Sequence, residues 1–198
     1  MINVTQKVLE IKSVKKIKIN ILINHLLKGG VCALSTDTIV GLSCVCNNTK
    51  AITKILKLKK RQINKGLILL CSDISQIKPY ISPNIDNNLL IKINKNHKKP
   101  TTWLIPANKK TSKLITGNND TVAVRLAKNK NICAICDALK KPIISTSANI
   151  EGYPPAQNNL ELKVYFKNNL DFIYLTDSVE NSQPSQIINI TNDQILRK

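Results

Sequence analysis

Acidic and aromatic residues are scarce in this sequence of 198 residues. Only 12 Asp and Glu stand against 30 Lys and Arg, which gives a formal net charge of +18, and aromatic residues make up 4% of the chain. The positive charge favours anionic partners such as nucleotides or RNA, because it raises their local concentration. The shortage of aromatic rings disfavours a protein that reads RNA by stacking its bases.

Long apolar runs are also missing. The most apolar stretch, residues 17–27, is interrupted by four polar residues, whereas a membrane-spanning helix needs about 20 apolar residues. Residues 1–16 lack the charged, apolar and small-residue order of a secretory signal. We therefore expect a cytoplasmic protein without a membrane association.

Arginine and glycine are rare, with 3 and 6 copies beside 27 Lys, 24 Asn and 29 Ile. The three abundant residues can all be encoded by A- and T-rich codons, so part of the lysine excess reflects codon composition and lies on solvated faces. The net charge by itself is therefore weak evidence for RNA binding. Where arginine is so rare, the three copies Arg61, Arg125 and Arg197 become candidate functional residues.

The apolar content is sufficient for a folded core. Hydrophobic residues make up 42% of the chain, and a chain of this length buries roughly 70% of its unfolded surface. We expect a single domain over residues 1–198, of α/β or α+β class, because helical and strand patterns recur throughout. The predicted helices are 15–28, 48–61, 73–80, 86–96, 131–140 and 160–167, and the predicted strands are 31–34, 66–71, 101–105, 121–126, 143–146, 172–175 and 185–190.

The cysteines favour a reduced protein. Cys133 and Cys136 have the spacing of half a zinc site, but the second half is missing and the chain has only two histidines. We interpret the six cysteines as small buried hydrophobic residues, with a structural zinc as the weaker alternative. His25 is expected to be structural and His97 to be solvated.

Three polar clusters follow predicted strands or a helix. They are residues 35–38 (Ser-Thr-Asp-Thr), residues 59–66 with Lys59, Arg61 and Lys65, and residues 145–149 (Ser-Thr-Ser-Ala-Asn). Hydroxyl, amide and cationic groups at the ends of buried strands can bind phosphates or a polar ligand. Each cluster taken alone also fits a plain alternative: a polar turn, a solvated helix end and a polar loop.

The familiar catalytic motifs are absent from the sequence. It contains no Gly-rich Walker loop and no dinucleotide fingerprint. With two histidines and no elbow motif around a serine, a Ser-His-Asp hydrolase is weakly supported.

Taken together and in order, the clusters resemble the YrdC/TsaC family of threonylcarbamoyl-AMP synthases, in its short bacterial form. The resemblance covers almost the whole chain. Its motifs are Ser-Thr-Asp-Thr-Ile-Val-Gly-Leu at 35–42, Leu-Lys-Lys-Arg at 58–61, Lys-Gly-Leu-Ile-Leu at 65–69, Pro-Thr-Thr at 100–102, Thr-Val-Ala-Val-Arg at 121–125, Ser-Thr-Ser-Ala-Asn at 145–149, Gln-Pro-Ser at 183–185 and Ile-Leu-Arg at 195–197. Each motif is weak alone, but their joint order and spacing are specific.

This resemblance implies a YrdC-like fold, a twisted open mixed β-sheet flanked by helices with a concave basic cavity. It also implies a nucleotidyltransferase that converts L-threonine, bicarbonate or CO2, and ATP to threonylcarbamoyl-adenylate and pyrophosphate, with Mg²⁺ on the phosphates. The product would pass to a threonylcarbamoyl-transferase complex that modifies an adenosine beside the anticodon of tRNA. The resemblance leaves direct tRNA binding open.

Roles for single residues also follow from the resemblance. Lys59 and Arg61 match a Lys-x-Arg pair that contacts ATP phosphates and is expected to be catalytic. ATP is further expected to contact Thr121, Ser147, Asn149 and Arg197, and substrate threonine to contact Thr36, Arg125, Ser145 and Ser185. No residue is identified as a metal ligand.

The sequence departs from the family pattern at several positions. Ser35 and Gln62 stand where proline is common, Val40 where an aromatic residue is common, and residues 97–99 replace a Trp-Pro-Gly-like segment. Since proline restricts the unfolded chain, its loss predicts softer loops and a less stable enzyme.

Two other functions remain open. A non-enzymatic module of the same fold would bind tRNA or double-stranded RNA with strong salt dependence. A carbamoyl-transfer maturation factor would act on another carbamate.

Overall fold

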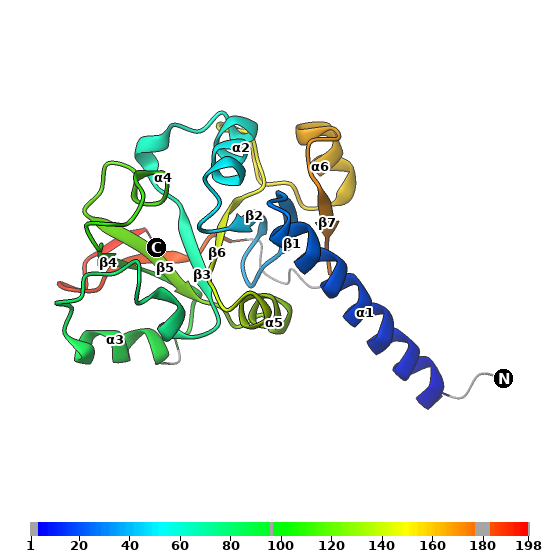
Figure 1. Cartoon of the computed structure of the whole chain (residues 1–198), viewed down its shortest axis with the longest axis horizontal. Coiled ribbons are helices and arrows are strands. Elements are labelled where there is room, and N and C mark those ends of the chain that lie inside the picture. Colours follow the sequence, from blue (N-terminus) through cyan, green and yellow to red (C-terminus); the bar gives the residue numbers. More distant parts are fainter. Residues whose placement is uncertain (1–3, 96, 177–182, 198) are drawn as a thin grey trace.

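The computed structural model describes residues 4–95, 97–176 and 183–197, which form one sheet with helices packed on it (Figure 1). The helices are α1 (Val4–Leu27), α2 (Thr49–Lys59), α3 (Asn87–Asn94), α4 (Lys113–Thr116), α5 (Lys130–Leu139) and α6 (Asn159–Phe166), with short 3-10 turns η1 (Ile63–Lys65) and η2 (Ile74–Ile77). The strands are β1 (Cys32–Ser35), β2 (Val40–Val45), β3 (Ile68–Cys71), β4 (Thr101–Pro106), β5 (Thr121–Leu126), β6 (Ile143–Ser147), β7 (Phe172–Tyr174), β8 (Gln186–Asn189) and β9 (Ile195–Arg197).

The sheet is open and mixed, with the strand order β7-β1-β2-β6-β3-β5-β4-β8-β9. The pairs β1/β7, β3/β5 and β4/β8 are parallel and the other five are antiparallel. Segments distant in the sequence therefore become neighbours, so that β6 lies between β2 and β3. The predicted fold class is confirmed.

Helices cover both faces of the central strands because alternate strand residues point to opposite faces. On one face, Leu22 of α1 and Ile135 of α5 share a buried cluster with Leu70 of β3. On the other face, Ile55 of α2 shares a buried cluster with Leu69 of the same strand. Buried apolar side chains on both sides explain the uninterrupted apolar run at residues 67–71.

Helix α2 forms as its sequence predicts. The Asn48 side chain caps it by accepting a hydrogen bond from the Ala51 N–H at 2.9 Å. Its buried face carries Ile52, Ile55, Leu56 and Lys59, and the helix ends at Lys60 in a left-handed conformation with φ of 50°. Because the helix ends here, Lys59 lies on its last turn and Arg61 lies in the loop that follows.

Several sequence predictions about local structure are wrong. The helix expected over 73–80 is only the short turn Ile74–Ile77. Strands β2 and β9 and the short helix α4 were not predicted, and α1 begins at Val4 rather than at residue 15. His97, expected to be solvated, has Nε2 2.8 Å from the Lys92 carbonyl oxygen and packs edge-on against Trp103.

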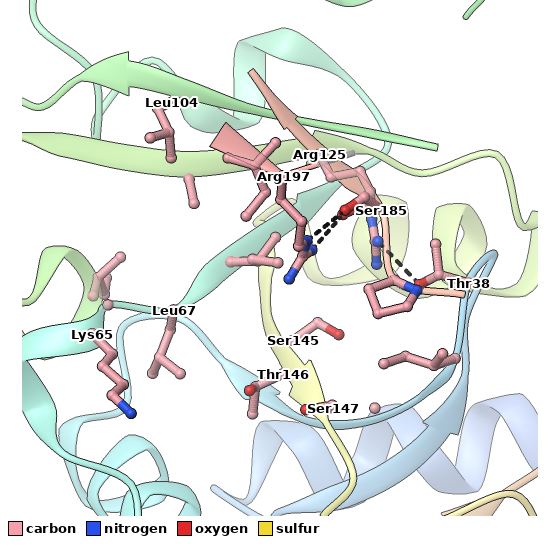
Figure 2. Close-up of a pocket in the computed structure, with 18 of the residues that line it drawn as sticks. Thr38, Lys65, Leu67, Leu104, Arg125, Ser145, Thr146, Ser147, Ser185 and Arg197 are labelled. Carbon is pink, nitrogen blue, oxygen red and sulfur yellow. Dashed lines mark hydrogen bonds between the residues drawn. The ribbon is translucent and has the colours of Figure 1, made fainter. Parts of the chain in front are cut away.

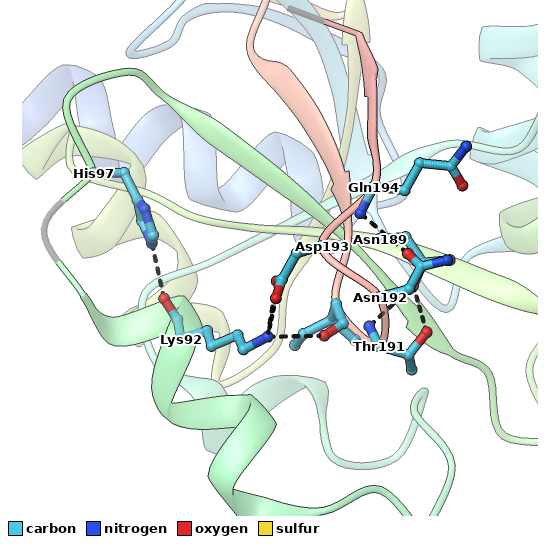
Figure 3. A network of polar contacts seen from close by, with 8 residues as sticks. Lys92, His97, Asn189, Thr191, Asn192, Asp193 and Gln194 are labelled. Atoms are coloured by element: carbon cyan, nitrogen blue, oxygen red, sulfur yellow. Dashed lines mark hydrogen bonds and ion pairs between the residues drawn. The ribbon is translucent and has the colours of Figure 1, made fainter.

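The hairpin β8–β9 is tied to helix α3 at its turn (Figure 3). Lys92 Nζ forms an ion pair with Asp193, at 2.7 Å from Oδ1 and 2.8 Å from Oδ2. The same ammonium is 3.4 Å from the Ile190 carbonyl oxygen. This end of the hairpin is thereby anchored, and the opposite end carries Ser185 and Arg197.

No helix within the described residues has the length and apolar character to cross a membrane. The cysteines lie inside the fold, five buried and Cys133 partly buried, all as free thiols. Cys133 and Cys136 are on α5, as predicted, and Cys136 belongs to its buried cluster. His25 stacks on Phe172 with ring centroids 5.3 Å apart, in keeping with a structural role.

The two positions that lack an expected proline differ in their surroundings. Ser35 Oγ accepts a hydrogen bond from the Thr176 N–H at 3.0 Å and donates to the Thr176 carbonyl at 3.4 Å, which ties the end of β1 to the chain after β7. This contact opposes the softening expected at Ser35. Gln62 has φ of −66°, a value that proline adopts, and within the described residues its N–H donates no hydrogen bond.

We therefore predict opposite effects of proline at these two positions. Gln62→Pro should raise the Tm by about 1 to 4 °C, because it restricts the unfolded chain without loss of a hydrogen bond. Ser35→Pro should lower the Tm, because it removes both contacts to Thr176. Differential scanning calorimetry of the two variants checks this, and an equal gain from both would contradict it.

Candidate substrate cavity

A cavity of about 370 Å³ opens over the sheet (Figure 2). Its floor is a row of four residues that pair with one another on adjacent strands. They are Ser145 of β6, Ile68 of β3, Ala123 of β5 and Leu104 of β4. Two of these side chains are small, which leaves space above the sheet. Gly41 adds to this space, since a Cβ there would lie 2.8 Å from Ser145 Oγ.

Three segments form the walls. The β8–β9 hairpin contributes Ile187, Leu196 and Arg197, and the segment 61–68 with η1 contributes Arg61 and Lys65. Residues 115–119 form the third wall, and their backbone contacts the backbone of η1. At Gly117, φ is +65° and a Cβ would lie 2.3 Å from the Asn64 carbonyl oxygen, so only glycine fits.

All charged residues that line the cavity are cations. They are Arg61, Lys65, Arg125 and Arg197, and the described lining holds no carboxylate. Among the described residues, the three arginines have no carboxylate within 4 Å, although Lys65 pairs with Glu151 outside the lining. The lining therefore suits an anionic ligand.

Arg125 is the most deeply placed of these cations, with 4% of its surface exposed. Its Nη1 donates to Thr38 Oγ1 at 3.0 Å, while its buried Nε has no partner. Burial lowers the pKa of Arg125; the charge of Asp37 opposes this and that of Arg197 adds to it. A buried, incompletely bonded guanidinium has donors left for a carboxylate or phosphate.

Arg197 and Ser185 hold each other at the cavity wall (Figure 2). Arg197 Nε donates to the Ser185 carbonyl at 2.9 Å, and Nη2 lies 3.3 Å from Ser185 Oγ. Ser185 Oγ is in turn 2.7 Å from Thr102 Oγ1. Burial lowers the pKa of Arg197.

The two threonines of the first cluster form a closed turn. Thr36 Oγ1 donates to the Ile39 carbonyl at 2.7 Å and lies 3.2 Å from the Thr38 N–H and 3.0 Å from Thr38 Oγ1. The Thr36 hydroxyl thus holds the turn from which Thr38 reaches Arg125. The cluster is a polar turn, as its plain interpretation says. Thr36 and Thr38 also line the cavity, as its functional interpretation requires.

Lys59 lies behind the cavity wall rather than on it. Its ammonium donates to the Asn149 carbonyl at 2.9 Å, to Asn149 Oδ1 at 2.8 Å, and to the Ser147 carbonyl. Burial, and to a lesser extent the charge of Arg61, lowers the pKa of Lys59 to about 7, while Glu151 acts in the opposite direction. Lys59 therefore organises the loop that carries Ser147.

Arg61 points into the cavity from the end of α2. Its Nη2 donates to the Gly66 carbonyl at 3.0 Å, and its buried Nε has no partner. Burial lowers the pKa of Arg61, and Glu151 opposes this. Lys59 and Arg61, two residues apart, point to different sides because α2 ends between them.

Eight of the ten predicted site residues line this cavity, and the two others, Lys59 and Asn149, lie directly behind it. Their roles toward ATP and threonine stay predictions. No ligand was predicted for Thr38 or Lys65, although both belong to the polar clusters at residues 35–38 and 59–66. Thr116 and Asn119 also line the cavity, and no pattern in the sequence indicated them.

The chain is similar to a family model and to named enzymes. The family model Sua5_yciO_yrdC, described as telomere recombination, matches residues 24–198. The threonylcarbamoyl-AMP synthase of Buchnera aphidicola is 40% identical over 169 residues, covering 84% of this chain and 95% of that protein. The threonylcarbamoyl-AMP synthase of Idiomarina loihiensis is 35% identical over 172 residues, covering 86% and 92%.

Solved structures share the fold. The crystal structure of P. abyssi Sua5 complexed with L-threonine superposes with a TM-score of 0.79 at 23% identity, covering 89% of this chain and 52% of that chain. E. coli YciO superposes with a TM-score of 0.72 at 22% identity, covering 91% and 88%. By the extent of the family match and the identity to these synthases, the chain belongs to the Sua5/YciO/YrdC family.

Proposed function

We propose that this protein is a threonylcarbamoyl-AMP synthase, a nucleotidyltransferase that makes threonylcarbamoyl-adenylate and pyrophosphate from L-threonine, bicarbonate or CO2, and ATP. The observation that carries this proposal is the cavity lined by Arg61, Lys65, Arg125 and Arg197 without a carboxylate among its described lining residues. Its family membership and its identity to named synthases support the same assignment.

The chemistry matches this kind of site. The amine of threonine adds to CO2 and gives a carbamate, and a carbamate oxygen attacks the α-phosphorus of ATP as pyrophosphate leaves. Negative charge spreads over the phosphate oxygens, so cations and correct positioning supply most of the catalysis. No nucleophilic side chain is needed.

We assign the cations to two parts of the substrates. Arg61, beside Lys65 and the Ser147 loop, would stabilise the phosphate chain, with Thr121 and Arg197 as further contacts. Arg125, deep in the cavity and next to Thr38, would bind the carboxylate of threonine, with Ser145 and Ser185 nearby. Lys59 would act mainly by holding Ser147 and Asn149 in place.

Mg²⁺ would enter with the phosphates of ATP. Hydroxyl and carbonyl oxygens line the cavity, but its described lining offers no carboxylate, and the described residues contain no group of three or more His, Cys, Asp or Glu that could hold a metal. This donor set does not fit a resident metal site, so no step is assigned to the ion. The unstable adenylate would pass to a transferase complex that modifies tRNA, and we propose that the protein acts in the cytoplasm.

Threonine-dependent release of pyrophosphate tests the reaction itself. Purified protein with Mg²⁺, ATP, bicarbonate and L-threonine should release pyrophosphate only when threonine is present, measured by a coupled phosphate assay. A sample with carbamoyl phosphate in place of threonine tests the maturation-factor alternative. Tight, salt-dependent tRNA binding without threonine-dependent pyrophosphate release would instead support the RNA-binding module.

Arg61 is the cation that we assign to the phosphate chain. Arg61→Ala should lower kcat/KM for threonine-dependent pyrophosphate release about thirtyfold, or about 2 kcal/mol, because it removes a desolvated phosphate contact. Arg61→Lys should also lose activity, since an ammonium lacks the bidentate geometry of a guanidinium. Full activity in Arg61→Lys would contradict a bidentate contact.

The affinity for ATP should depend on pH. In the free protein the pKa of Lys59 is lowered to about 7, and a bound phosphate chain should raise it, so ATP binding should take up a proton. The ATP affinity should then fall by up to about tenfold per pH unit above pH ~7. Calorimetric titrations in buffers of different ionisation enthalpy measure this uptake.

Lys59→Gln is the matched control for the pH prediction. Its amide keeps hydrogen-bond donors near Asn149 but does not titrate, so the proton uptake above pH ~7 should disappear. An unchanged pH dependence in this variant would show that another group takes up the proton.

A further inference from the structure

One carboxylate lies next to the cations of the cavity without lining it. Glu151 Oε1 forms an ion pair with Lys65 Nζ, and Lys65 is a lining residue. The side chains of Lys65 and Glu151 are 46% and 38% exposed. The pair therefore joins the loop after β6 to the turn η1 at the solvent side of the cavity.

The backbone of Glu151 is held in place by Lys59. The Glu151 N–H donates to the Lys59 carbonyl at 2.8 Å, and the Lys59 ammonium holds Asn149, two residues earlier. Glu151 is thus fixed at the end of α2, where Arg61 emerges. Its charge acts on this whole group of cations, since it raises the pKa of both Lys59 and Arg61 against the effect of burial.

The ion pair distinguishes Lys65 from the other cations. Of the four cations that line the described part of the cavity, Lys65 is the one with a carboxylate within 4 Å. A polyphosphate that uses Lys65 must first replace this carboxylate. An ion pair between two half-exposed side chains is weak and readily broken.

We propose that Glu151 is an internal competitor that lowers the affinity of the cavity for polyphosphates by occupying Lys65 until the phosphates of the nucleotide displace it. This inference rests on the proposed function, in that the cavity binds the phosphate chain of ATP. Glu151 would thus set the affinity of the cavity for the nucleotide without contact with the reacting atoms.

The test is the binding of ATP, and of inorganic triphosphate, to wild type and Glu151→Gln by calorimetry at low salt. Removal of the competing charge should tighten the Kd for both ligands about two- to fivefold. Glu161→Gln is the matched control, because it makes the same chemical change at a surface acid of α6 that has no cation within 4 Å among the described residues. The control should leave both Kd values unchanged.

A double-mutant cycle separates competition from a general effect of charge. Lys65→Met should weaken binding more in the Glu151→Gln background than in wild type, because only there is the ammonium free before the ligand binds. Equal losses in both backgrounds would overturn the proposal. The Tm of Glu151→Gln should stay close to that of wild type, so a folding defect would not explain the result.

The remaining outcomes are also decisive. Unchanged or weaker binding by Glu151→Gln overturns the proposal, and a loss seen only with Mg²⁺ would identify Glu151 as a metal ligand. Tighter triphosphate binding without any ATP binding would support the competitor and contradict the proposed synthase. Binding of neither ligand to any variant would overturn both.

Discussion

The main physical constraint on this site is a set of three arginines that have no carboxylate within 4 Å among the described residues. Arg61, Arg125 and Arg197 converge on one cavity, and burial lowers the pKa of each. Removing such cations from water without a directly paired anion costs free energy, most of all for Arg125, which is 4% exposed. The packing of the sheet and of the cavity walls must supply that free energy, and an anionic ligand would offset it on binding.

Contacts from neighbouring side chains hold these cations and the adjacent loop in position. Thr38 orients Arg125, and Ser185 together with Thr102 orients Arg197. Lys59 holds the loop of Ser147 and Asn149 in the same way. Donors fixed before the ligand arrives need little reorganisation during the reaction, which is how such sites stabilise developing charge.

Patterns of burial made much of the fold predictable. Strand β3 was found because both of its faces are buried, and α2 because its cap and its apolar face agree. Strand β9 could not be found, since its three residues are exposed and only pairing with β8 makes them a strand. The turn at 74–77 shows the opposite error, in which a capping signal is followed by one short 3-10 turn and not by an α-helix.

The sequence by itself determined which residue types would matter. Arginine is so rare that its three copies stood out, and all three line the cavity. Only the tertiary structure decided their partners and the cavity floor between them, because strand register places Ser145, Ile68, Ala123 and Leu104 in one row across four strands. It also set Lys59 behind the wall and Glu151 beside Lys65, since contacts between distant segments depend on packing that a linear pattern does not encode.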